Sequence, residues 1–359
     1  MKKCISVKTH RRRKQGAEQG RRQETEPGAG RKAAWLLVTV FVILILAFSV
    51  LAIRKVLTEA AGVDGAGFPA AKGEYPAANT GKSAVKAETG ETTVTAPAVS
   101  AGAAILIDGE DGTVLYEKSA DQKMYPASTT KIMTALVVLE TLEDLELGLD
   151  SEIIVPAEAQ GVEGSSLYLK AGERMSVEEL LYGLMLQSGN DGAVALAACV
   201  GGSVEHFVDQ MNQRAAELGC RGTHFVNPNG LYDGEHYTTA RDLAYIAREA
   251  MKREDFRKIA GTQRWSSEGD ETLADSKEQV SNDGGATRTF VNKNKTVFQY
   301  EGGDGVKIGF TKASGRTLVS SASRDGHRVI AVVLNDGNWF QDAYALMDYG
   351  FAVLETSKP

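Results

Sequence analysis

Two side chains at the start of one apolar segment could do chemistry together: Ser128 and Lys131 in PASTTKIMTALVVLE, which begins at Pro126. Residues three apart lie on one face of a helix, so this spacing brings the hydroxyl and the amine together. A serine hydroxyl becomes a useful nucleophile only when a neighbouring base takes its proton. A lysine serves as that base if burial and nearby positive charge lower its pKa enough to leave a neutral fraction. Taken alone, the segment favours a simpler interpretation, with Ser128 as a helix N-cap and Lys131 as a solvent-reaching surface lysine.

Two later segments carry the polar side chains that such a pair needs. QSGND places Ser188 and Asn190 at a break between two apolar helices, where polar side chains face a shared cleft. GVKIGFT places Lys307 on a strand whose apolar neighbours indicate burial. Each segment is weak alone, since Ser-Gly-Asn is also an ordinary helix-breaking turn. Together they supply a hydroxyl, an amide and a second positive charge.

The sequence indicates no metal or cofactor site. It contains neither a CxxC nor an HExxH pattern, and its five histidines are scattered without ligand spacing. Cys199 and Cys220 could form a disulfide in an extracellular compartment. Each lies in an apolar helical context, which favours two buried thiols instead. We therefore expect chemistry that uses side chains alone.

An α+β pattern extends over residues 101–359. Strands AAILID and TVLYEK open it, strands GVKIGFT, TLVSSAS and RVIAVVLN come late, and a terminal helix begins near Trp339. Between them lie helices with Ser176 and Thr239 as N-caps and with Gly219 as a stop signal. The segment FVNPNGL is interpreted as turn and capping residues. Strands from both ends predict one antiparallel sheet flanked by helices.

The first hundred residues predict a membrane anchor and a tether. Residues 33–53, AAWLLVTVFVILILAFSVLAI, carry no charge and are long enough to cross a hydrocarbon core of about 30 Å. Residues 1–32 are strongly basic although the whole chain has a net charge of −7, so the positive-inside rule places this tail in the cytoplasm. Residues 54–100 have almost no large apolar side chains and predict a flexible linker.

This pattern predicts a single-pass protein of the cell membrane whose folded domain lies outside the cell. A cleaved signal peptide, with a small-residue site at Val50 and Ala52, is the alternative. The basic tail is expected to set topology and not to bind nucleic acid.

The three chemically suggestive segments also carry a family resemblance. In order they are Ser128-Thr-Thr-Lys131, Ser188-Gly-Asn190 and Lys307-Ile-Gly309. They correspond to the Ser-x-x-Lys, Ser-x-Asn and Lys-Thr-Gly elements of penicillin-binding proteins and class A β-lactamases, with Ile308 in place of the threonine. With their flanks, such as LYLKAGERMSVEELLYGLMLQSGNDGAVALA, they resemble the low-molecular-weight D-alanyl-D-alanine carboxypeptidases of serine peptidase family S11. The likeness covers about Ala101–Leu354. It implies a β-lactamase/transpeptidase-like fold, an antiparallel sheet flanked by helices plus a helical subdomain.

The resemblance implies a role for each residue. Ser128 would attack the penultimate D-alanine of a peptidoglycan stem pentapeptide, with Lys131 as general base. Ser188 would relay a proton to the leaving D-alanine, Asn190 would hold the substrate amide, and Lys307 would add positive charge for the terminal carboxylate. A β-lactam antibiotic, which mimics the D-Ala-D-Ala end, would acylate the same serine. The expected partners are therefore the stem peptide, β-lactams, and the membrane through the N-terminal helix.

The motif strand is the expected substrate-binding edge, through Gly309, Phe310 and Thr311. Backbone N–H groups of Ser128 and Phe310 would form the oxyanion hole. The middle motif residue is Ile308, where the family has a threonine whose hydroxyl helps to bind the carboxylate, and we expect Thr311 to compensate in part. Two alternatives to the carboxypeptidase remain: a β-lactamase-like hydrolase, for which no glutamate signature is evident, and a catalytically impaired wall-binding relative.

Overall fold

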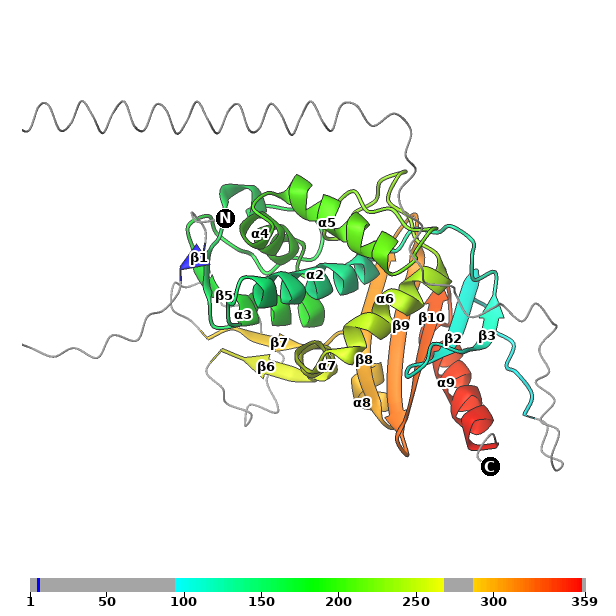
Figure 1. Ribbon diagram of the computed structural model, residues 1–359. Helices are drawn as coiled ribbons and strands as arrows, with labels where there is room; N and C mark the ends of the chain where they lie inside the picture. The colour runs from blue at the N-terminus through cyan, green and yellow to red at the C-terminus, as the bar shows by residue number, and fades with distance from the viewer. Residues whose placement is uncertain (1–4, 7–93, 268–286, 357–359) are drawn as a thin grey trace, which may run out of the picture. The chain divides into compact units, whose positions relative to one another are not determined.

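A five-stranded antiparallel sheet joins the two ends of the folded region. In the computed structural model, which describes residues 5–6, 94–267 and 287–356, the strands lie in the order β3-β2-β10-β9-β8 (Figure 1). The sheet is built from β2 (Ala103–Asp108), β3 (Val114–Lys118), β8 (Gly303–Thr311), β9 (Gly315–Arg324) and β10 (His327–Leu334). The sequence predicted these five strands and the antiparallel α+β sheet, and both predictions are confirmed.

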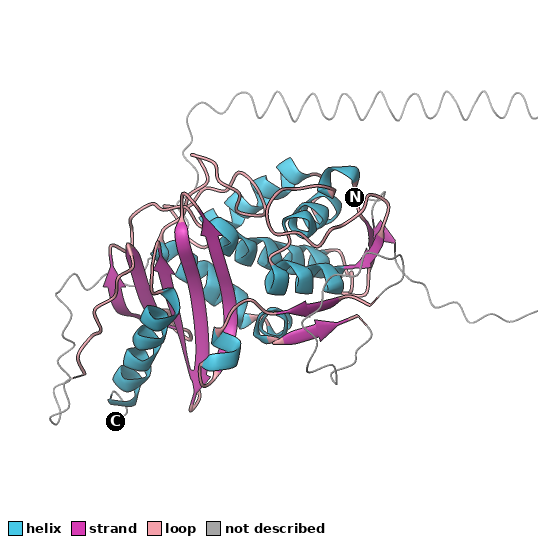
Figure 2. Cartoon of the chain, turned by 180° about the vertical axis from the view of Figure 1, so that it is seen from behind, coloured by secondary structure: helices cyan, strands magenta, loops and turns pink. Residues whose placement is uncertain are grey.

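The sheet is buried on both faces because its central strands are apolar on both sides. On β2, Ile105 and Ile107 face one hydrophobic cluster, while Leu106 faces the other. Helix α9 (Trp339–Thr356) covers the second face, as Figure 2 shows from behind. Helix α6 (Ala240–Lys252) packs across β10 and β2 on the first face.

The helical subdomain is centred on α2 (Lys131–Asp144). This helix is apolar around most of its circumference, which suits a helix enclosed by others. It packs against α4 (Asn190–Val200), α5 (Val204–Glu217) and α6. Since α2 begins at Lys131, its enclosure also fixes where that side chain enters the interior.

The helix boundaries follow the signals in the sequence. The Ser176 hydroxyl accepts the N–H of Glu179, and the Thr239 hydroxyl accepts the N–H of Asp242, each at 3.0 Å. Gly219 has a φ of +79° just beyond α5, where glycine carries no steric penalty. These local signals are confirmed because capping depends on residues within one turn.

Shorter elements complete the described chain. They are β1 (Ile5–Ser6), η1 (Ala127–Thr130), β4 (Glu152–Ile154), η2 (Ala157–Ala159), β5 (Arg174–Ser176), α3 (Val177–Tyr182), η3 (Gly183–Gln187), α7 (Glu254–Gly261), β6 (Arg264–Ser266), β7 (Thr289–Val291) and α8 (Thr296–Gln299). Strands β1, β4 and β5 form a small sheet, and β6 pairs with β7. Strands of two or three residues are too short to show a period of two, so the sequence did not predict them.

Two sequence expectations concern parts outside the sheet. Cys199 and Cys220 are both buried and are not joined by a disulfide, which confirms the prediction of two buried thiols. The segment 33–53, predicted to span a membrane, lies outside the described residues. Within the described ranges no helix is long and apolar enough to cross a bilayer.

The contact between α9 and the sheet gives a test of the packing. A Cβ on Gly350 would lie 2.8 Å from Leu106 Cδ2, so Gly350→Ala should lower the free energy of unfolding by about 1–3 kcal/mol through overpacking. Leu106→Ala should cost about 2–5 kcal/mol because it leaves a cavity. In the double variant the new methyl group enters that cavity, so its cost should be clearly smaller than the sum. Urea denaturation measures all three, and an additive result would contradict this packing.

Candidate active site

Ser128 lies in the 3₁₀ turn η1, directly before α2. No side-chain hydrogen bond caps either element, so the interpretation of Ser128 as an N-cap is wrong. The neighbouring threonines hold the turn instead: Thr129 Oγ1 donates to Pro126 O at 2.6 Å and Thr130 Oγ1 donates to Ala127 O at 2.8 Å. The Ser128 side chain is left half-buried and accessible.

Lys131 is fully buried, so the surface-lysine interpretation is also wrong. Its Nζ donates to Ser128 Oγ at 3.1 Å, to Asn190 Oδ1 at 2.7 Å and to Asn229 O at 2.5 Å. A carbonyl oxygen only accepts, so the last two contacts require N–H groups. A neutral amine has two N–H groups and one lone pair. When Lys131 is neutral, its lone pair is therefore directed at the Ser128 hydroxyl.

Three lysines set the electrostatics of this region. Burial and then the positive charges of Lys307 and Lys293 hold the pKa of Lys131 well below its ordinary value, with Asp191 opposing them weakly. Burial, followed by the charge of Lys293, lowers the pKa of Lys307 to about 7. Like charges in a low-dielectric interior disfavour simultaneous protonation. Lys131 is thus the kind of lysine that can act as a base.

Lys293 is a component of the site that the sequence did not reveal. It follows β7, and its Nζ donates to Gln187 O at 2.7 Å while its N–H donates to Leu186 O at 3.2 Å. These bonds fasten the segment to the end of η3, next to Ser188. Its side chain is exposed at the surface, and partial desolvation there lowers the pKa of its own ammonium. In the polar stretch NKNK nothing distinguishes this lysine from a surface residue.

Ser188 and Asn190 lie at the turn between η3 and α4, as predicted. Ser188 is buried with a φ of +65°, and within the described chain its hydroxyl makes no hydrogen bond with Ser128 or Lys131. Besides accepting from Lys131, Asn190 donates through Nδ2 to Glu163 O at 2.7 Å. The asparagine amide therefore positions the lysine, a function that the sequence analysis did not assign to it.

Asp191, the next residue in QSGND, holds the loop beneath the turn. Its buried carboxylate accepts the N–H groups of Leu167 at 2.9 Å and of Leu169 at 3.1 Å. The Leu167 side chain fills the space where a Cβ on Gly189 would lie, 2.5 Å from Leu167 Cγ. Glycine at 189 is therefore required for close packing and not for its backbone conformation.

Strand β8 passes directly against the η1 turn that contains Ser128. A Cβ on Gly309 would lie 2.9 Å from the Ser128 nitrogen, so only glycine allows this approach. Lys307 is buried, and Phe310 is 63% exposed at the edge of the sheet. The Thr311 hydroxyl accepts the Ser314 N–H at 3.0 Å and so closes the β8–β9 turn.

Ile308 lies on the opposite side of β8 from Gly309. Successive side chains of a strand point to opposite faces, and Ile308 packs against the cluster beneath α9. Thr311, expected to compensate for the missing motif threonine, has its hydroxyl engaged in the hairpin turn. A hydroxyl introduced at 308 in this side-chain position would not face Ser128.

The FVNPNGL segment contributes both a turn and an acceptor. Asn227 Oδ1 accepts the Gly230 N–H at 2.7 Å, and Asn229 Oδ1 accepts the Leu231 N–H at 3.0 Å, which confirms their capping roles. The backbone oxygen of Asn229 is also an acceptor for Lys131. Main-chain atoms have no signature in the sequence, and this contact was missed.

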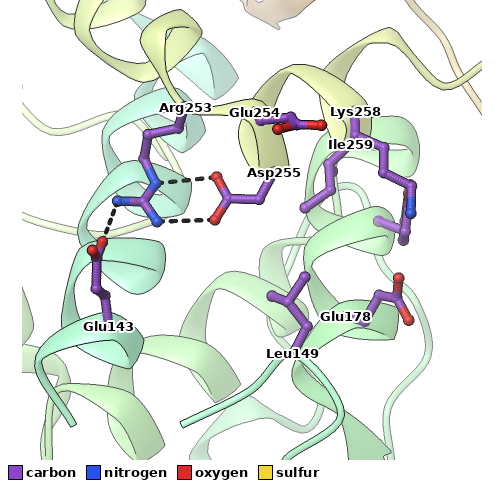
Figure 3. A pocket seen from close by; sticks show the side chains of 9 residues that line it. Glu143, Leu149, Glu178, Arg253, Glu254, Asp255, Lys258 and Ile259 are labelled. Carbon is purple, nitrogen blue, oxygen red and sulfur yellow. Dashed lines mark hydrogen bonds and ion pairs between the residues drawn. The ribbon is translucent and has the colours of Figure 1, made fainter. Parts of the chain in front are cut away.

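A separate surface pocket of about 560 Å³ lies between the ends of α2 and α3 and helix α7 (Figure 3). Its arginine is already paired, because Arg253 donates to Asp255 at 2.9 Å and to Glu143 at 2.8 Å. None of the predicted site residues lines it; its lining residues are Glu143, Leu149, Glu178, Tyr182, Arg253, Glu254, Asp255, Lys258 and Ile259.

Comparisons with known proteins identify the family of this chain. The family model described as D-alanyl-D-alanine carboxypeptidase matches residues 90–338. The D-alanyl-D-alanine carboxypeptidase DacF of Bacillus subtilis (strain 168) is 35% identical over 259 residues, a match that covers 71% of this chain but only 63% of that relative.

Two solved structures share the fold of this chain over most of its length. The D-alanyl-D-alanine carboxypeptidase DacD of Francisella tularensis has a TM-score of 0.64 at 32% identity, covering 74% of both chains. The Streptomyces K15 DD-transpeptidase has a TM-score of 0.63 at 34% identity, covering 72% of this chain and 100% of that one. The chain therefore belongs to the D-alanyl-D-alanine carboxypeptidase family of serine peptidases, family S11.

Proposed function

We propose that this chain is a serine-type D-Ala-D-Ala carboxypeptidase that removes the terminal D-alanine of peptidoglycan stem pentapeptides through an acyl-enzyme on Ser128. The observation that carries the proposal is the hydrogen bonding of Lys131. Asn190 Oδ1 and Asn229 O can only accept, so they take the two N–H groups of the neutral amine. The lone pair of Lys131 Nζ is then directed at Ser128 Oγ. Burial and positive neighbours supply the lowered pKa that a general base needs.

Acylation starts when Ser128 Oγ gives its proton to Lys131 Nζ and bonds to the carbonyl carbon of the penultimate D-alanine. The charge that develops on the carbonyl oxygen meets the N–H groups of Ser128 and Phe310, and one such donor is worth about 2.7–4 kcal/mol in other enzymes. As the C–N bond breaks, the proton passes from Lys131 to the amine of the leaving D-alanine, with Ser188 as the relay. Water then hydrolyses the ester, and Lys131 takes and returns its proton.

Lys307 and Lys293 suit recognition of the substrate's terminal carboxylate. Burial, followed by the charge of Lys293, lowers the pKa of Lys307 to about 7, so both of its protonation states are accessible near neutral pH. A carboxylate nearby favours its charged form, and that charge in turn favours the neutral form of Lys131. Substrate binding would therefore place the proton on Lys307 and keep Lys131 ready as the base.

Three outcomes with penicillin separate this proposal from its alternatives. A carboxypeptidase of this kind should form a stable acyl-enzyme, a β-lactamase-like hydrolase should turn the drug over quickly, and an impaired wall-binding relative should form no adduct. Intact-protein mass spectrometry over a time course distinguishes them. Release of D-alanine from a D-Ala-D-Ala peptide, measured in parallel, tests the carboxypeptidase activity itself.

Replacing the nucleophile and the base should have different effects. Ser128→Ala should fold normally yet take up no penicillin, because the attacking oxygen is gone. Lys131→Ala should still be acylated, but about a hundredfold or more slowly, on the scale of general-base catalysis. Ser100→Ala, at an exposed serine that bonds to Asp342 of α9, serves as a control for label specificity. Undiminished label on Ser128→Ala would refute the assignment of the nucleophile.

Lys293 should set the pH range over which Ser128 is acylated, because it shifts the pKa of the proposed base, Lys131. Its positive charge lowers the pKa of both Lys131 and Lys307. Lys293→Met removes that charge, so the pKa of Lys131 should rise and the acid limb of the pH–rate profile should move to higher pH. Lys295→Met, at an exposed lysine 5.8 Å from the Phe340 ring, is the matched control and should not move the limb. An unchanged limb in Lys293→Met would remove this lysine from the electrostatics of the base.

We also propose that residues 33–53 anchor the protein in the cell membrane, with 1–32 in the cytoplasm and the catalytic domain outside, joined by the linker 54–100. The uncharged run and the basic tail before it support this topology. In the structure Ile5 pairs with Ile153 on β4, an arrangement that one chain cannot adopt while the tail is on the other side of a membrane. The two arrangements exclude each other and can be distinguished by labelling.

Cys4 reports on the location of the tail, because Cys199 and Cys220 are buried. In cells stripped of their wall, a membrane-impermeant maleimide should leave Cys4 unlabelled until the membrane is permeabilised. A Ser83→Cys, Cys4→Ser protein should be labelled in intact cells, since the linker lies outside. Labelling of Cys4 in intact cells would contradict the anchor and favour the pairing with β4.

A further inference from the structure

His236 is a buried imidazole that the mechanism above does not use. It is 2% exposed and lies behind the nucleophile turn, on the segment that leads to α6. Its Nδ1 lies 3.1 Å from the Val226 nitrogen, and its Nε2 lies 2.8 Å from Thr130 Oγ1. Thr130 belongs to the Ser-Thr-Thr-Lys motif, so this histidine contacts the motif from inside the protein.

The directions of these hydrogen bonds follow from the partners. A backbone N–H only donates, so Nδ1 accepts from Val226. The Thr130 hydroxyl has one hydrogen, which it donates to Ala127 O at 2.8 Å, so Oγ1 accepts from Nε2–H. His236 is thus a neutral imidazole with its proton on Nε2. Burial supports this state, since it lowers the pKa of His236 to about 4.

The relay ends on the peptide group that joins Ala127 to Ser128. Ala127 has a φ of +49°, a left-handed conformation that a non-glycine residue adopts only when its surroundings hold it there. A peptide group is planar and trans, so its C=O and N–H point in opposite directions. Fixing Ala127 O towards Thr130 therefore fixes the direction of the Ser128 N–H.

The other side of this peptide group meets β8. The Ser128 nitrogen lies 2.9 Å from the position of a Cβ on Gly309, beside the strand whose Phe310 N–H is the second proposed oxyanion donor. Gly230 closes the opposite side, since a Cβ there would lie 1.9 Å from Ala127 O. The peptide plane is thus confined sterically on two sides, and within these limits the Thr130 hydroxyl donates a directional hydrogen bond to its carbonyl oxygen.

We propose that His236 is a positioning residue for acylation: through Thr130 it sets the plane of the Ala127–Ser128 peptide and so aims the Ser128 N–H at the developing oxyanion. The proposal rests on the proposed function of Ser128 as nucleophile. Loss of an oxyanion donor slows catalysis by about a hundredfold or more in other enzymes. A donor that is present but misaimed should cost about tenfold or more.

Four variants separate this role from simple structural support. In His236→Gln the amide nitrogen takes the place of Nε2 and can still donate to Thr130. In His236→Asn the shorter side chain can accept from Val226 in place of Nδ1 but cannot reach Thr130. Thr130→Ser keeps the hydroxyl, and Thr130→Val removes it with little change of shape. Acylation by a fluorescent penicillin gives the limiting rate and the half-saturating concentration separately, and thermal melts report stability.

The acylation rates should depend on whether a variant keeps the hydrogen bond between residue 236 and the Thr130 hydroxyl, and not on its thermal stability. His236→Gln and Thr130→Ser should keep the limiting acylation rate within about threefold, whereas His236→Asn and Thr130→Val should lose about tenfold or more with little change in half-saturating concentration. Since both residues act in one relay, combining His236→Asn with Thr130→Val should slow acylation no further than the slower single variant. Thr130→Val and Thr130→Ser carry the test even if a His236 variant fails to fold.

Three results would overturn the proposal: wild-type rates for the two variants that lack the relay, equal losses for Gln and Asn, or additive losses in the double variant. No label on the wild-type protein would overturn the proposed function, and this proposal with it. Normal labelling of the wild type together with fast acylation of Thr130→Val would overturn the positioning role alone.

Discussion

The burial of one amine constrains the rest of this structure. Lys131 has no exposed surface, and a charged ammonium in such a place is costly unless it is solvated by the protein or loses its proton. Acceptors from α4 and from the 227–231 turn solvate the amine. Burial and the positive charges of Lys307 and Lys293 favour loss of its proton. These groups come from four separate segments. The helical subdomain and the sheet must therefore pack in one relative arrangement for the amine to be satisfied.

The sheet is the second constraint, because it places β8 against the turn that contains Ser128. Its two apolar faces are covered by α9 and by the helices around α6, which leaves little freedom for the strand to move. From β9, Thr317 Oγ1 donates to Pro126 O at 3.1 Å and ties the sheet to the residues just before Ser128. The turn that contains Ser128 is thus fixed by an element nearly two hundred residues later in the chain. Such an arrangement suits a site that must present donors and a base to one carbonyl group.

The sequence predicted the parts of this protein that depend on local chemistry. Strand patterns, the Ser176 and Thr239 caps and the three motifs all follow from residues close together in the chain. Prediction from the sequence failed for residues whose place in the site depends on a contact with a distant segment or with a backbone atom. Lys293 meets Gln187, and His236 meets Thr130, across about a hundred residues that no periodicity connects. The face of the sheet to which the Ile308 side chain points depends on the register of β8 with β9, and a three-residue motif does not specify that register.

Much of this site is held by carbonyl oxygens of the main chain and not by side chains. Asn229 O receives Lys131, Gln187 O receives Lys293 and Ala127 O receives Thr130. Such acceptors survive a change of residue type, because every amino acid carries the same carbonyl group. A substitution at these three positions therefore leaves the acceptor itself in place as long as the local chain path is kept, whatever it does to the turn that the side chain helps to hold. Insertions, deletions and prolines, which alter that path, would be selected against far more strongly than ordinary substitutions.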